Sequence, residues 1–149
     1  MTMVRRLADL AIRPLATAAN KARRALRRRG RSAASGGHAI ALTGDRRIVL
    51  VKLRYAPGWR LPGGGRGDGE SLRDVALREL REEIGMTSHG PVRPLAAIDP
   101  SLVLVEQVAF VPRRWSWEVE RIVAADIDAL PPGTSPLARR WIAAFRRLE

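Results

Sequence analysis

The chain has 149 residues, 46% of them hydrophobic, no cysteine and a formal net charge of +12 at pH 7. This length and hydrophobic content fit one globular domain with a modest core. The lack of cysteine excludes disulfides and thiolate metal sites and favours a reducing, cytoplasmic setting. No run of 18 apolar residues that would span a membrane is present.

The beginning of the chain carries most of the positive charge. Residues 1–32 contain ten Arg or Lys side chains and one acid, Asp9, which gives this segment a net charge of +9. Apolar residues recur there at near-helical spacing, with an expected kink at Pro14. We therefore divide the chain into a basic amphipathic helical arm with its linker, residues 1–37, and a domain, residues 38–149.

Several roles fit residues 1–31. A basic amphipathic helix can lie peripherally on an anionic membrane surface, and a run of arginines can bind RNA phosphates. An Arg-rich, acid-poor segment is also typical of an organelle targeting peptide. The plainest alternative is a solvated helix that packs weakly on its own domain. Apolar side chains such as Met3 and Leu7 slightly favour the membrane surface.

The domain opens with segments typical of strands. His38–Thr43 and Arg47–Leu53 flank Gly44-Asp45, which predicts a β-hairpin. A loop containing Pro57 follows, and then a strand-like segment, residues 59–62. These elements directly precede the segment that contains most of the candidate site residues.

Residues 61–86 read LPGGGRGDGESLRDVALRELREEIGM and combine a glycine-rich turn with an acidic helix. Ser71 and Gly85 are typical start and stop residues, which predicts a helix from Ser71 to about Ile84. Within it, Glu79 and Glu83 point within about 40° of each other, and Glu82 lies about 60° from Glu79. The neighbouring stripe is apolar and is expected to be buried: Ala76, Leu77, Leu80 and Ile84.

Three like charges on one short helix repel one another, so this segment favours bound cations. Carboxylate oxygens suit Mg²⁺, with Mn²⁺ as an alternative. Arg78 is placed to neutralise part of the cluster, and Glu70 to orient a neighbour. The glycines match neither the P-loop nor the G-x-G-x-x-G pattern, so they predict a turn. The alternative to a metal site is a solvent-exposed helix whose glutamates and arginines form i,i+4 ion pairs.

The spacing G-x5-E-x7-R-E-L-x-E-E-x-G-M resembles the Nudix hydrolase box at every fixed position. Those positions are Gly64, Glu70, Arg78, Glu79, Leu80, Glu82, Glu83, Gly85 and Met86. The resemblance implies an α/β fold, an α/β/α sandwich around a mixed β-sheet. It also implies an enzyme that cleaves nucleoside diphosphates linked to a second moiety, by attack of water at phosphorus.

The same resemblance implies roles for the box residues. Glu79, Glu82 and Glu83 would bind the metal, with the Gly64 carbonyl as an additional ligand. One of the glutamates would also act as the base, which places Glu82 and Glu79 among the catalytic residues. Arg78 and Glu70 would be the orienting pair.

After the box, the pattern predicts three more strands and a helix. The strands are expected at Val92–Ile98, Leu102–Val111 and Trp115–Val123. Pro131-Pro132-Gly133 breaks the chain, and Ser135–Leu148 is expected to be a closing helix. Its expected apolar face consists of Leu137, Trp141, Ile142, Phe145 and Leu148.

Candidate substrate-binding residues lie on both sides of the box. Trp59 and Arg60 precede it, and the ring of Trp59, like those of Trp115 and Trp117, offers a face for a base. Core packing is the more common use of tryptophan. Further acids follow the box in a region from which Nudix enzymes often recruit an additional base or ligand: Glu106, Glu118 and Glu120. A solvated strand face is the alternative for each.

The sequence thus predicts a Mg²⁺-dependent hydrolase of a nucleotide-derived small molecule. Two alternatives stay open: a nucleotide- or RNA-binding module without catalysis, and an RNA 5′-end pyrophosphohydrolase whose basic arm contacts RNA. The intact acidic triplet argues against a pure binding module, because a binder does not need three adjacent glutamates. The second moiety and the oligomeric state are not indicated.

Overall fold

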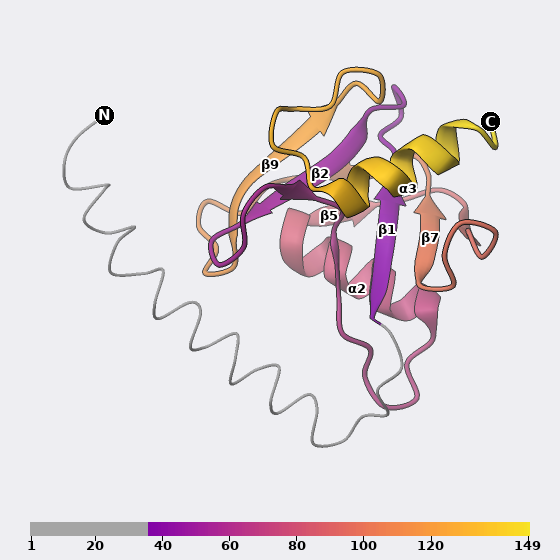
Figure 1. Cartoon of the computed structure of the whole chain (residues 1–149). Coiled ribbons are helices and arrows are strands. Elements are labelled where there is room, and N and C mark those ends of the chain that lie inside the picture. Colours follow the sequence, from indigo (N-terminus) through magenta and orange to yellow (C-terminus); the bar gives the residue numbers. More distant parts are fainter. Residues whose placement is uncertain (1–35) are drawn as a thin grey trace.

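The structure, a computed structural model, describes residues 36–149 (Figure 1). The predicted basic arm, residues 1–31, and residues 32–35 of its linker lie outside the described residues. The strands are β1 Gly37–Ala41, β2 Ile48–Leu53, β3 Trp59–Arg60, β4 Gly63–Gly64, β5 Met86–Ser88, β6 Val92–Pro94, β7 Leu102–Val105, β8 Ala109–Phe110 and β9 Val119–Ala125. The helices are α2 Leu72–Ile84 and α3 Pro136–Arg146.

The strands form one mixed sheet and two antiparallel sheets. The mixed sheet has the order β4-β1-β7-β6, in which β1 and β7 run parallel and the outer pairs antiparallel. The second sheet has the order β3-β2-β9, and β5 pairs with β8. Because β4 pairs with Gly37 and His38, the glycine-rich turn lies beside the start of β1.

Helices α2 and α3 cover opposite faces of the central strands. Successive residues of a strand point to opposite faces. In β1, Ala39 packs in the cluster that contains α2, and Ile40 packs in the cluster that contains α3. Strands β2 and β7 alternate in the same way. In Figure 1, α3 crosses in front of β1 and α2 lies behind it. The predicted α/β/α sandwich with a mixed sheet is confirmed.

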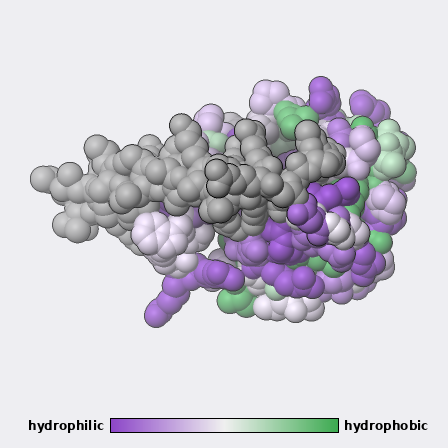
Figure 2. Space-filling model, turned by 90° about the horizontal axis from the view of Figure 1, so that it is seen from below, coloured by the Kyte–Doolittle hydropathy of each residue, from purple (hydrophilic) through white to green (hydrophobic). Residues whose placement is uncertain are grey.

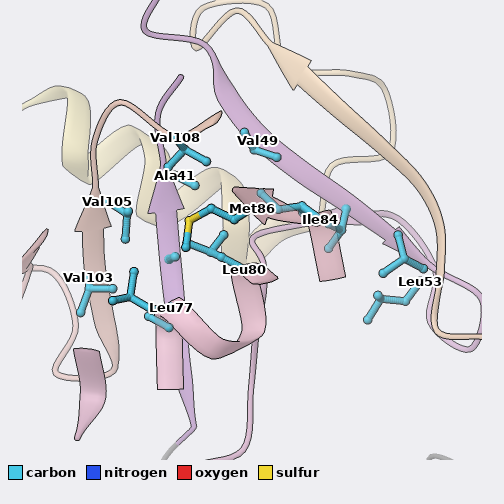
Figure 3. Close-up of a cluster of buried hydrophobic side chains, with 14 residues drawn as sticks. Ala41, Val49, Leu53, Leu77, Leu80, Ile84, Met86, Val103, Val105 and Val108 are labelled. Atoms are coloured by element: carbon cyan, nitrogen blue, oxygen red, sulfur yellow. The ribbon is translucent and has the colours of Figure 1, made fainter. Parts of the chain in front are cut away.

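The apolar stripe of α2 fixes the helix on the sheets. Leu77, Leu80 and Ile84 lie in one cluster with residues of β1, β2 and β7 (Figure 3). All four residues of the predicted stripe are buried. Burying a leucine or isoleucine side chain stabilises a fold by about 1.5–3 kcal/mol. This packing sets the position of the polar residues on the same helix.

The predicted β-hairpin is wrong. Strands β1 and β2 belong to different sheets and share one isolated bridge, between Leu42 and Ile48. A strand has two hydrogen-bonding edges, and those of β1 are taken by β4 and β7, whereas β2 pairs with β3 and β9. The turn itself forms, since Thr43 accepts a backbone hydrogen bond from Arg46 at 2.9 Å.

Two of the strands predicted after the box are shorter than expected. Leu102–Val111 is divided into β7 and β8, because Gln107 has a φ of 52° and turns the chain between them. The segment Val92–Ile98 leaves the sheet after Pro94, where a turn closes with a hydrogen bond from Ile98 N to Leu95 O of 2.8 Å.

The last strand and the last helix differ in detail from the prediction. Strand β9 begins at Val119, since the Ser116 hydroxyl accepts backbone hydrogen bonds from Glu118 and Val119 and holds a turn there. In α3 the buried residues are Ala138, Trp141, Ile142 and Phe145. Leu137 and Leu148 are exposed instead of buried, because Leu137 points off this face and Leu148 lies beyond the helix end.

The exposed surface is consistent with apolar clusters that lie inside the fold. On the part of the lower face that is visible in Figure 2, hydrophilic side chains predominate and hydrophobic ones are scattered. Neither helix within residues 36–149 has the length and apolar character needed to cross a membrane.

Candidate active site

Helix α2 presents the acidic residues and has well-defined ends. Ser71 caps its start, and the Ser71 hydroxyl accepts a hydrogen bond from Asp74 N at 3.1 Å. Gly85 ends it with a φ of 71° and a ψ of 40°, a left-handed conformation that favours glycine. A Cβ on Gly85 would also lie 2.1 Å from the Val111 carbonyl oxygen. The sequence therefore fixes both the length and the register of the helix.

Arg78 joins the glycine-rich turn to the acidic helix. Its guanidinium binds both oxygens of Glu70, with Nε–Oε1 at 2.7 Å and Nη2–Oε2 at 3.1 Å, and Nη2 donates to the Gly65 carbonyl at 2.9 Å. Glu70 also accepts from Gly67 N at 2.6 Å. The hydrogen bond to Glu70 and then the charge of Glu79 raise the pKa of Arg78. Arg78 is thus a permanent cation in a forked contact, which a lysine cannot reproduce.

Two glutamates of α2 are buried. Glu79 is 3% exposed and accepts from Arg78 Nη1 at 2.8 Å, while Glu83 is 5% exposed and accepts from Gly63 N at 3.0 Å. A Cβ at Gly64 would lie 2.2 Å from Glu79 Oε1, so the glycine backbone approaches this carboxylate closely. The Gly64 carbonyl oxygen lies beside Gly36.

Burial makes the ionised form of Glu83 costly. Removal from water, and then the charges of Glu79, Glu118 and Glu82, raise the pKa of Glu83 well above its usual value. Glu82 is more exposed and lies 3.6 Å from Arg78 Nη1. Negative charge therefore gathers around the glycine turn, and Arg78 contacts three of its carboxylates: Glu70, Glu79 and Glu82.

The other predicted site residues lie in β3, in β9 or directly before β9. Trp59 is half-buried in β3, and the guanidinium carbon of Arg121 lies 5.7 Å from the centre of its ring. Arg60 donates to the Pro57 carbonyl at 3.3 Å, and its Nε has no hydrogen-bond partner among the described residues. Glu118 accepts from the Tyr55 hydroxyl at 3.0 Å, and Glu120 is half-exposed on β9.

A family model described as NUDIX domain matches residues 36–136, which is more than half of the chain. The chain belongs to the NUDIX domain family. The matched range contains the glycine turn, all of α2 and the segments that carry Tyr55 and Glu118, so the cluster described above is part of the family domain.

Known proteins of several kinds are similar to this NUDIX chain. A Bacillus subtilis (strain 168) protein whose name contains the words 8-oxo-dGTP diphosphatase is 44% identical over 50 residues, 34% of each chain. An RNA pyrophosphohydrolase of Dinoroseobacter shibae (strain DSM 16493 / NCIMB 14021 / DFL 12) is 30% identical over 105 residues, 62% of this chain and 65% of the relative. This chain therefore spans less than two thirds of the length of either relative.

A solved structure shares the fold. The MutT NUDIX hydrolase from Burkholderia pseudomallei is 26% identical, with a TM-score of 0.54 over 72% of this chain and 94% of that one.

The sequence did not indicate a cleft that lies beside the NUDIX site. It has a volume of about 490 Å³ and is lined by Lys52, Leu53, Arg54, Tyr55, Ala56, Pro57, Gly58 and Glu120. Tyr55 joins the cleft to the acidic cluster through Glu118, which is close enough to Glu83 to raise its pKa. The residues involved are about 63 positions apart in the chain, so no local pattern could have revealed the contact.

Proposed function

We propose that this chain is a Mg²⁺-dependent hydrolase that cleaves a pyrophosphate bond in a nucleoside diphosphate derivative, with Mn²⁺ as a possible substitute. The observation that carries the proposal is that Glu79 and Glu83 are buried beside the glycine backbone, on the same helix as Glu82, and that Arg78 contacts Glu79 and Glu82. Buried carboxylates of this kind are unfavourable unless cations bind them.

The donor set fits a hard divalent cation, although the side chains are not yet gathered around one point. Within residues 36–149, no three Asp, Glu or His side chains converge closely enough to hold an ion. Glu79 is bound by Arg78 and Glu83 by Gly63, so these contacts must loosen when a cation binds. The donors are carboxylate oxygens, which suit Mg²⁺ and Mn²⁺.

Each residue has a part in the proposed reaction. Glu79, Glu82 and Glu83 would hold the metal, with the Gly64 carbonyl as a further ligand. The bound metal would neutralise the diphosphate and lower the pKa of a water molecule. Glu82 is our candidate for the base, because its side chain is 37% exposed while the other two glutamates are buried. Arg78 and Glu70 would keep the glycine turn and Glu79 in position.

Substrate binding is proposed to occur on the β2–β9 side of this cluster. Glu120 lines the cleft of about 490 Å³, and Glu118 and Arg60 bind two other residues of its lining, Tyr55 and Pro57. Trp59 has Arg121 against its ring, so a base that stacks there must share or displace that contact.

A panel of nucleotides tests the proposed activity. Nucleoside triphosphates, dinucleoside polyphosphates, nucleotide sugars and ADP-ribose are incubated with Mg²⁺, Mn²⁺ or EDTA, and the products are separated. We expect a nucleoside monophosphate from at least one substrate with either metal and none with EDTA. Binding without product under all metal conditions would support the alternative, a nucleotide- or RNA-binding module without catalysis.

RNA with a 5′-terminal triphosphate is the second candidate substrate. It is favoured by the similarity to an RNA pyrophosphohydrolase over 62% of this chain. The basic arm, residues 1–31, would supply phosphate contacts with RNA, or else contacts with an anionic membrane surface. Release of pyrophosphate from a short 5′-triphosphorylated RNA, compared with the free nucleotide, distinguishes this substrate from the small ones.

A further inference from the structure

Two tryptophans stand at the surface in the segment between β8 and β9. Trp115 and Trp117 are 48% and 58% exposed, and their rings meet edge to face with centroids 4.2 Å apart. Large aromatic side chains are normally buried for the stability this gives, and where they stay exposed they are enriched at binding surfaces. The packing of the described domain does not account for this pair.

This segment is held at both ends. Arg54 Nε donates to the Ser116 carbonyl at 3.0 Å, between the two tryptophans, and the Ser116 hydroxyl accepts from Val119 N at 3.0 Å. At the other end, Val111 N donates to the Gly85 carbonyl at 3.0 Å. The rings are therefore presented on a fixed turn, which reduces the entropy lost when a ligand binds them.

The same contacts place the turn beside the candidate active site. Gly85 ends α2 two residues after Glu83, so the Val111 end of the segment touches the carboxyl end of the acidic helix. The Ser116 end contacts Arg54, which lines the cleft of about 490 Å³. The next acid after the pair, Glu118, binds Tyr55 of that cleft. The segment that carries the tryptophans thus runs from the end of α2 to a residue that lines the cleft.

Residues 113–117 carry positive charge, whereas α2 carries the cluster of glutamates. Arg113 and Arg114 are exposed and directly precede Trp115. Aromatic faces next to arginines suit a base joined to a phosphate, because the ring stacks on the base while the guanidinium binds the phosphate. A purely apolar partner would be a poorer match, since two arginines would lose water without gaining an anion.

From this placement we propose that the turn 113–117 is a nucleobase-binding subsite, in which the base of the substrate stacks on Trp115 and Trp117. The proposal rests on the proposed function for the identity of the substrate, a nucleotide. Its diphosphate would extend toward α2, with Arg113 and Arg114 at the phosphate between the two sites. The base can belong to a small nucleotide or to a nucleotide near the 5′ end of RNA.

Quenching of tryptophan fluorescence tests the subsite without any need for catalysis. The full-length protein is titrated in EDTA with AMP and, separately, with a short oligoadenylate. We expect saturable quenching by at least one ligand. The double substitution Trp115→Ala/Trp117→Ala should abolish it and weaken binding of that ligand, followed by calorimetry, by roughly tenfold or more. Phenylalanine still stacks, so Trp115→Phe/Trp117→Phe should lose the signal but keep most of the affinity.

Controls separate stacking from other effects. Leu148→Ala removes an equally exposed apolar side chain from the far end of the chain, and it should bind like the wild type. Quenching by AMP indicates a small nucleotide as the source of the base, and quenching by the oligoadenylate alone indicates RNA. Unchanged quenching or unchanged affinity in the double alanine variant would overturn the subsite. Since EDTA prevents metal-dependent hydrolysis, this result is independent of whether the proposed activity is found.

Discussion

Helices α2 and α3 pack on opposite faces of the same strands, yet they bury different kinds of side chain. Every buried residue of α3 is apolar: Ala138, Trp141, Ile142 and Phe145. Helix α2 buries five apolar residues in the same way, but it also buries Glu79 and Glu83. One helix therefore serves the core alone, and the other combines packing with charge.

The difference indicates that the buried carboxylates of α2 lower the stability of the fold and serve the chemistry of the site. Removing a carboxylate from water costs free energy unless it is hydrogen-bonded and balanced by opposite charge. In α2, Arg78 contacts Glu79 and the glycine backbone donates to Glu83, yet burial and neighbouring acids still raise the pKa of Glu83. Substitutions on α3 should change stability and spare chemistry, and polar substitutions on α2 should do the reverse.

The largest effect on stability is expected on α3. Phe145 is fully buried, so Phe145→Ala should lower the free energy of unfolding by about 3–5 kcal/mol through lost transfer energy and a cavity. Urea denaturation measures this, with exposed Leu148→Ala as the control, expected within about 0.5 kcal/mol of wild type. A Phe145→Ala protein that is nearly as stable as wild type would contradict the assigned role of α3.

Arg78→Lys tests the forked contact on α2. Lysine keeps the charge but cannot bind both oxygens of Glu70 and the Gly65 carbonyl together. We expect kcat/KM to fall roughly tenfold, about 1.4 kcal/mol, while the fold is retained. Circular dichroism checks the fold and steady-state kinetics the loss. Unchanged kinetics would mean that Arg78 acts through its charge alone.

A smaller effect concerns pH and Glu83. Because the folded pKa of Glu83 lies above its unfolded value, its contribution to stability is present below about pH 4.3 and is lost as the pH rises through the folded pKa. Glutamine does not titrate and can still accept from Gly63 N. In EDTA, Glu83→Gln should therefore become more stable than wild type as the pH rises toward neutrality. Parallel curves of stability against pH for the two proteins would refute this.

The smallest effect on catalysis is expected from the basic arm. Deleting residues 1–31 leaves every residue of the glycine turn and α2 in place, so hydrolysis of small nucleotides should change by no more than about twofold. Binding to anionic vesicles or RNA, and its dependence on salt, should be lost. A truncated protein that cannot fold would show that the arm belongs to the domain.

The comparison of the helices also explains what the sequence could predict. Caps, apolar stripe and glutamates of α2 are local features, so Ser71, Gly85 and the acidic face could be placed from spacing alone. Strand pairing is not local, and β1 and β2 separate because other strands compete for their edges. The sequence does not predict the turn at Gln107, since a glutamine with a φ of 52° has no strong sequence signal. The contact of Tyr55 with Glu118 joins distant segments and depended on the fold.

The central claim is that the glutamates of α2 serve metal-dependent hydrolysis rather than the fold. The most direct measurement compares turnover with Mg²⁺ for wild type, Glu82→Gln, Glu83→Gln and the matched control Glu106→Gln. Glu106 directly follows β7, beside the end of β1, whereas β4 pairs with the start of β1. The Glu106 carboxylate lies 3.9 Å from the guanidinium of Arg46. We predict a loss of about 100-fold or more for both α2 variants and near wild-type turnover for Glu106→Gln. Near wild-type turnover in both α2 variants would contradict the account.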